Sequence, residues 1–160
     1  MFQGRRPMWV SGTAMRTRDR LSCTFRIRSD LDELDPLWAE VEAELQLWVS
    51  LSEPTRSDFR LALTEAVANA ILHAHGEDGR PLDVEVIVER GRLEARVHDS
   101  GPGFVLTESD VTRRASRLES GRGLGLVQAL AADVRYLRDA ASNELSFALA
   151  VDWPSTRDLS

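Results

Sequence analysis

Two neighbouring segments of the sequence alternate between apolar and polar residues, and only two residues separate them. Residues 82–89 read LDVEVIVE and residues 92–99 read RLEARVHD, so each has apolar side chains at every second position. A repeat of two is the period of a β-strand, and Arg90-Gly91 between the segments predicts a hairpin turn. The other side of each strand is charged, which favours an antiparallel sheet with one face in water.

The remaining segments extend this hairpin into an α+β pattern. We expect a strand over SCTFRIRS, helices from Asp30 to about Val49 and from about Thr55 to His73, a third helix within GRGLGLVQALAAD, and last strands in VRYLRD and ELSFALAV. Ser52 is a suitable N-cap for the second helix. The order predicts a two-layer sandwich with helices on one face of a mainly antiparallel (mixed) sheet.

The charge distribution suggests how the chain is divided. Residues 1–20 hold five arginines and one aspartate, a charge of +4, although the whole chain carries -6. We therefore expect a flexible basic extension over 1–20, one domain over 21–153 and a short tail over 154–160. A net negative charge argues against direct binding of nucleic acid, whose partners are basic.

Residue usage excludes several chemistries. All twenty basic residues are arginine, so a Walker A loop, a eukaryotic-type protein kinase and a Schiff base are excluded, because each needs a lysine. The one cysteine, Cys23, excludes an internal disulfide and a multi-cysteine zinc site, and we expect it in the core. No apolar run is long enough to cross a membrane, and we expect a cytoplasmic protein.

The second helix contains the segment TEAVANAILHAH, in which Glu65, Asn69 and His73 follow one another at intervals of four residues. Residues so spaced lie on one helix face. Alone, the segment is well explained as a helix with one face in water. For His73 we expect a structural role.

Two glycine-rich segments follow. The first, HDSGPGF, places Asp99 at a strand end before Gly101 and Gly103, which allow close approach to a flat ligand; a common turn has the same composition. The second, SGRGLGL, opens a helix. Its residues are Ser120, Gly121, Arg122, Gly123, Leu124 and Gly125. Backbone N–H groups at a helix start attract phosphate, although an ordinary glycine-rich turn would look the same. About twenty residues separate Ser100 from this segment, a length typical of a lid.

Taken in order, these segments resemble the GHKL ATP-binding domain, also called the Bergerat fold, over roughly Leu21 to Trp153. The closest likeness is to bacterial anti-sigma-factor serine/threonine kinases of partner-switching systems. The resemblance implies ATP and Mg²⁺ as cofactors, a sigma factor and an anti-anti-sigma (antagonist) protein as partners, and a homodimer formed through the leading strand and helix.

The resemblance also implies roles for individual residues. Asn69 would be a magnesium ligand and Glu65 the general base for the hydroxyl group of the partner protein. Asp99 would bind the adenine amino group, with Gly101 and Gly103 shaping that pocket. Residues 120–125 would connect the lid to the phosphate groups of ATP.

Two departures from the family pattern leave alternatives open. Where relatives often have Gly-Thr before the last strand, this chain has SNELSF, so Ser142 or Asn143 could replace the threonine near the adenine, or the contact could be missing. Glu119 stands where some relatives place an arginine, which leaves Arg122, Arg117 or the Arg113-Arg114 pair to meet the phosphates. The alternatives are an ATP-binding anti-sigma or adaptor module without significant kinase activity, and a histidine-kinase-like ATPase domain.

Overall fold

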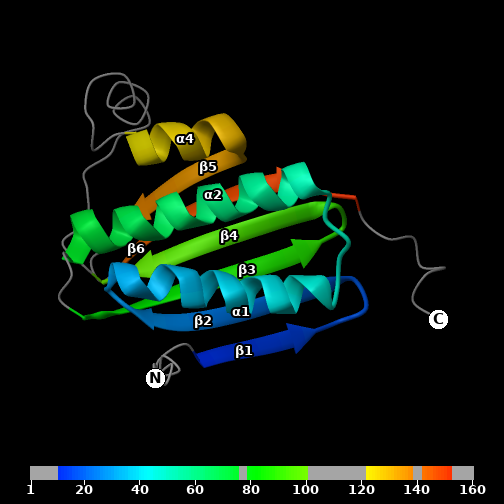
Figure 1. Ribbon diagram of the computed structural model, residues 1–160, viewed down its shortest axis with the longest axis horizontal. Coiled ribbons are helices and arrows are strands. Elements are labelled where there is room, and N and C mark those ends of the chain that lie inside the picture. Colours follow the sequence, from blue (N-terminus) through cyan, green and yellow to red (C-terminus); the bar gives the residue numbers. More distant parts are fainter. Residues whose placement is uncertain (1–10, 76–78, 101–121, 139–141, 153–160) are drawn as a thin grey trace, which may run out of the picture.

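The computed structural model describes residues 11–75, 79–100, 122–138 and 142–152, which form one sheet and a layer of helices (Figure 1). The elements in chain order are β1 (Ser11–Arg16), β2 (Arg20–Arg28), η1 (Leu31–Glu33), α1 (Leu34–Gln46), α2 (Glu53–Asn69), η2 (Ala70–His75), β3 (Pro81–Glu89), β4 (Arg92–Asp99), α4 (Arg122–Leu130), β5 (Ala132–Arg138) and β6 (Asn143–Ala150).

The described strands form a six-stranded sheet in the order β1-β2-β3-β4-β6-β5. All five pairings between them are antiparallel, which confirms the α+β prediction; the mixed pairing it allowed does not occur among these strands. The β3–β4 hairpin turns at Arg90 and Gly91, both with positive φ (42° and 80°), as a tight hairpin turn requires.

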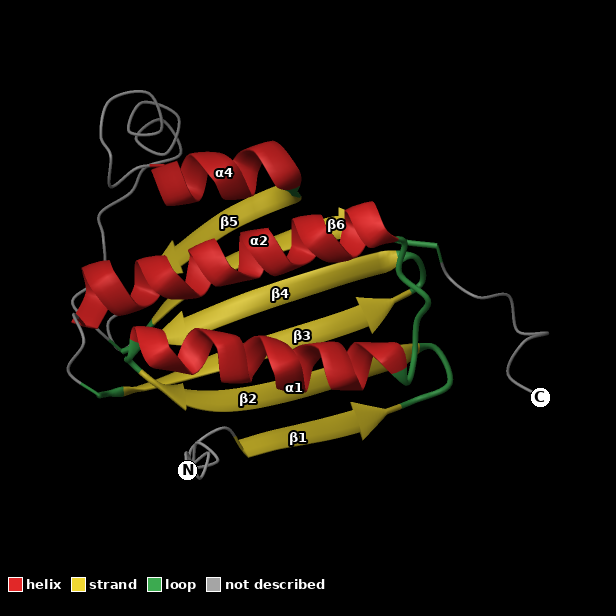
Figure 2. Cartoon of the chain, viewed as in Figure 1, coloured by secondary structure: helices red, strands yellow, loops and turns green. Residues whose placement is uncertain are grey.

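The helices α1, α2 and α4 all lie on one face of the sheet (Figure 2), and no other α-helix is present in the described part of the chain. The predicted alternation decides which side chains point into the core: Val84, Val86 and Val88 are at most 2% exposed. Phe59 of α2 joins the two layers, since its ring lies 6.3 Å from that of Trp38 on α1 and 5.9 Å from that of Phe147 on β6.

Cys23 is 2% exposed among these core residues, as the sequence predicts. Burial raises the pKa of its thiol to about 11. A thiol in this state is largely protonated at neutral pH and therefore a poor nucleophile.

Asp30 caps the short 3-10 turn η1, so α1 begins later than predicted, at Leu34, and ends earlier, at Gln46. The second helix begins as predicted and ends differently. The Ser52 side chain accepts a hydrogen bond from the Thr55 backbone N–H and caps α2. The α-helix ends at Asn69, and a π-helical segment, η2, continues to His75. The sequence AILHAH predicts a continued α-helix, since it contains no glycine or proline.

The prediction of a flexible extension over 1–20 is wrong for its second half. Residues 11–16 form β1, whose six residues all pair with β2. β1 is an edge strand beyond the helices, and its residues from Gly12 onward are exposed. Because neither face is buried, its sequence lacks the apolar alternation that identifies the other strands.

The face of the sheet away from α1, α2 and α4 carries charged and polar side chains in hydrogen-bonded pairs. Arg96 donates to Glu94 at 2.6 Å, and Ser22 donates to Glu85 at 3.0 Å. Such pairs contribute little to stability where water reaches them. No helix in the described part of the chain is long and apolar enough to cross a membrane.

Two glycines with positive φ allow a matched test of the hairpin. A Cβ at Gly91 would lie 3.2 Å from the Val151 carbonyl oxygen, whereas a Cβ at Gly79 would meet nothing within 4 Å. The left-handed backbone should cost each alanine variant about 1 kcal/mol, and Gly91→Ala should lose about 1 kcal/mol more through its steric contact. Urea unfolding measures both values. Equal losses of unfolding free energy in Gly91→Ala and Gly79→Ala would contradict a close approach of the hairpin to the end of β6.

Candidate functional site

The segments that the sequence singles out meet at one end of the sandwich. The end of α2, the end of β4 and the start of α4 all lie on the left in Figure 1. The start of β6 joins them, because Asn143 is the cross-strand partner of Asp99. The topology therefore gathers residues more than seventy positions apart in sequence.

Asp99 is a buried carboxylate at the end of β4. It shares the core-facing side of the strand with Val97 and is 9% exposed. The Asn143 Nδ2 atom donates a hydrogen bond to its Oδ1 atom at 2.9 Å, and Asn143 itself is 2% exposed. Of the two residues left open by the sequence, Ser142 is exposed and Asn143 contacts Asp99.

Asn69 ends the α-helical part of α2, one turn after Glu65, and both residues are half-buried. The Nδ2 atom of Asn69 is buried and has no hydrogen-bond acceptor among the described residues. A buried amide without a partner costs about 1–3 kcal/mol; Glu33 and Trp48 each have such an atom in the described part of the chain as well.

The glycine-rich segments are described only in part. Gly101, Gly103, Ser120 and Gly121 lie outside the described residues. The helix α4 begins at Arg122, so Gly123 and Gly125 are in its first turns and do not precede it. Side chains are not described at 122–124, nor at His73.

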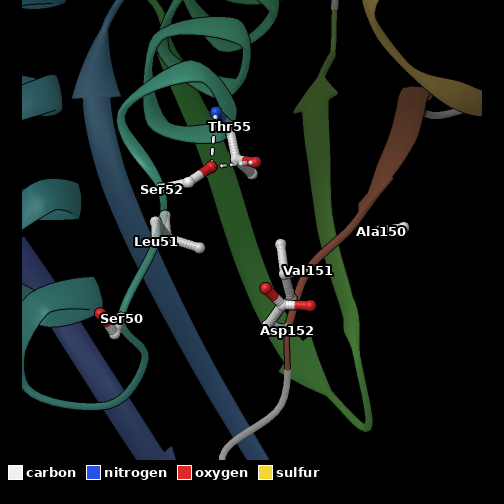
Figure 3. Close-up of a pocket in the computed structure, with 7 residues that line it drawn as sticks. All are labelled: Ser50, Leu51, Ser52, Thr55, Ala150, Val151 and Asp152. Carbon is white, nitrogen blue, oxygen red and sulfur yellow. Dashed lines mark hydrogen bonds between the residues drawn. The ribbon is translucent and has the colours of Figure 1, made fainter.

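A hollow of about 180 Å³ lies at the opposite end of the same elements (Figure 3). It is lined by the residues before and at the start of α2 and by the end of β6, including Ser52, Thr55 and Asp152. The seventeen residues of α2 span about 25 Å, which separates this hollow from Asn69. Ser52 is engaged in capping the helix, so the hollow is not part of the candidate site.

Comparison with known proteins adds to this geometry. The family model of the histidine kinase-like ATPase domain matches residues 27–149. This chain belongs to that family. The match confirms the predicted GHKL fold, and it covers α2, β4 and α4, the elements that meet at the candidate site. No curated protein matches the sequence.

Solved structures share the fold of this ATPase domain. The RsbU and RsbW domains of Rv1364c from Mycobacterium tuberculosis align with 82% of this chain at 16% identity and a TM-score of 0.60. The histidine kinase AdeS of Acinetobacter baumannii aligns with 79% of it at 17% identity and a TM-score of 0.51. The chain spans 33% of the first structure's chain and 68% of the second's.

The Mg²⁺ that usually accompanies ATP in this family needs few protein ligands. In the described part of the chain, no group of three or more His, Cys, Asp or Glu side chains is placed to hold a metal. Mg²⁺ is commonly bound by one or two protein oxygens together with phosphates and waters. The Asn69 amide suits this arrangement, because its oxygen can ligate the cation while its Nδ2 atom donates to a phosphate oxygen.

The two asparagines of the site should respond oppositely to alanine. Asn69→Ala removes a buried amide without an acceptor, so we expect the free energy of unfolding without nucleotide to rise by about 1–2 kcal/mol. Asn143→Ala removes the donor to a buried carboxylate, so we expect it to fall by about 1–3 kcal/mol. Denaturant unfolding of both variants measures the two changes. If Asn69→Ala lowered the free energy of unfolding as much as Asn143→Ala does, the expected contrast between the two asparagines would be wrong.

Proposed function

We propose that this chain is an ATP-dependent serine/threonine kinase that acts as an anti-sigma factor and phosphorylates an antagonist protein. The observation that carries the proposal is the buried Asn69 amide, which has no acceptor among the residues that the structure describes and lies one helical turn from Glu65. A phosphate-bearing ligand with its cation supplies what this amide lacks. The fold shared with a chain that contains an RsbW domain supports the same class.

The nucleotide would lie along the end of the sandwich. Asp99 would accept a hydrogen bond from the adenine amino group, because a carboxylate only accepts and that group only donates. Asn69 would hold Mg²⁺ beside the phosphates. The bound cation would neutralise charge on the transferred phosphoryl group, which is the main requirement of this chemistry.

Glu65 would then act as the general base. Its carboxylate accepts the proton of a serine or threonine hydroxyl group on the antagonist, and the hydroxyl oxygen forms a bond to the γ-phosphorus. The bond from that phosphorus to the β–γ bridging oxygen breaks, and ADP leaves. The single turn between Glu65 and Asn69 puts their Cβ atoms about 6 Å apart, so the carboxylate and the amide could both act on one phosphoryl group.

The proposed kinase class also implies two regulatory partners. A kinase of this class would bind a sigma factor in one state and its antagonist in the other. A homodimer through the leading strand and helix stays a prediction, and the exposed edge of β1 is compatible with it.

Glu65→Gln should separate catalysis from binding. It keeps the shape of the side chain but cannot accept a proton, so we expect phosphotransfer from ATP to the antagonist to fall about 10²–10⁴-fold while ATP affinity stays within about threefold. Radiolabelled ATP with the antagonist measures transfer, and calorimetry measures binding. Glu53→Gln, at the exposed start of α2, is the matched control and should keep full activity.

The outcomes separate the three candidate functions. Transfer unchanged in Glu65→Gln would contradict the proposed base. ATP binding without transfer to any antagonist would instead indicate an adaptor module. Acid-labile phosphate on the acceptor would indicate histidine-kinase-like chemistry, because phosphoserine and phosphothreonine survive acid.

A further inference from the structure

Asn143 and Asp99 form a buried pair at the place where the proposed function puts the adenine. They are cross-strand partners at the last residue of β4 and the first of β6. Both belong to the core-facing rows of their strands, which contain Val97 and Leu145. The backbone pairing of β4 with β6 therefore sets the positions of the two Cα atoms, and the 2.9 Å hydrogen bond sets how the two side chains meet.

A hydrogen bond to one carboxylate oxygen also orients the other. The carboxyl group of Asp99 is planar, so holding Oδ1 against the Asn143 amide stops rotation of that plane and sets the direction of Oδ2. Burial strengthens this effect, because little water is present to compete for either oxygen. The geometry points to Asn143 as a positioning residue that orients Asp99 toward a 6-amino purine and thereby sets the preference for ATP over GTP.

The preference follows from the two bases. Adenine presents an amino group at position 6, whereas guanine presents a carbonyl oxygen there. A carboxylate oxygen held toward that position accepts a hydrogen bond from adenine and faces a second acceptor in guanine. A site built around a fixed hydrogen bond rejects a ligand that cannot make it. Without the Asn143 donor, Asp99 is held less firmly, so ATP loses part of a prepared acceptor and the penalty against GTP falls.

This inference rests on the proposed function in taking ATP as the ligand and in placing its adenine amino group at Asp99. The test uses the full chain and measures the dissociation constants of Mg-ATP and Mg-GTP by calorimetry. In Asn143→Ala we expect ATP binding to weaken about tenfold and the ratio of GTP to ATP dissociation constants to fall by about the same factor.

Two further variants grade the effect. Asn143→Thr restores a hydroxyl donor, so its ratio should return to within about threefold of the unmodified protein. Asn143→Asp places a second carboxylate against Asp99, and repulsion between the two charges should weaken ATP binding more than alanine does.

Leu145→Ala is the control for simple loss of packing. Leu145 is the next core-facing residue of β6 and is 8% exposed. Its truncation should lower the melting temperature but leave the ratio of the two dissociation constants unchanged. A shifted ratio in Leu145→Ala as large as in Asn143→Ala would contradict the assignment.

The remaining outcomes distinguish the two proposals. If the unmodified protein binds ATP and Asn143→Ala has the same ratio of GTP to ATP dissociation constants, Asn143 only holds the two strand ends together. This inference is then wrong while the proposed function stands. If the unmodified protein binds neither nucleotide, both are wrong.

Discussion

The buried hydrogen bond from Asn143 to Asp99 joins the ends of two central strands at the edge where the candidate site lies. A carboxylate this far from water needs a donor, because an unpaired buried charge would destabilise the fold. The amide of Asn143 is one such donor, and we propose that it also orients the carboxylate. The start of α4 and the end of α2 lie around this edge, so the geometry of the site depends on the pair.

A second asparagine shows the opposite arrangement. Asn69 keeps a buried amide without an acceptor in the described part of the chain, at the residue where α2 passes into a π-helical turn. Stability would favour an apolar side chain there, while the proposed binding of a cation and phosphates would favour the amide. Residues that cost stability and have no structural partner tend to mark functional sites.

The sequence predicts best what periodicity controls. The β3–β4 hairpin, the capping by Ser52 and the burial of Cys23 follow from local patterns. β1 could not be found in this way, since an exposed edge strand has no buried side to show. The choice between Ser142 and Asn143 depends on the register between β4 and β6, which long-range pairing decides. The π-helical end of α2 has no sequence signal, because AILHAH suits an α-helix equally well.

A substitution of Asp99 tests the proposed ATP site most directly, since the proposed recognition of adenine depends on its carboxylate. Asp99→Asn keeps an oxygen for Asn143 but replaces the other oxygen with an amino group, which cannot accept from adenine. Ligand bound only to the folded state at a hundred times its dissociation constant adds about 2.7 kcal/mol of stability. We predict that saturating Mg-ATP raises the melting temperature of the unmodified protein by several degrees and leaves that of Asp99→Asn unchanged at the same concentration. An equal rise in both proteins would contradict the assignment of this end of the sandwich as the ATP site.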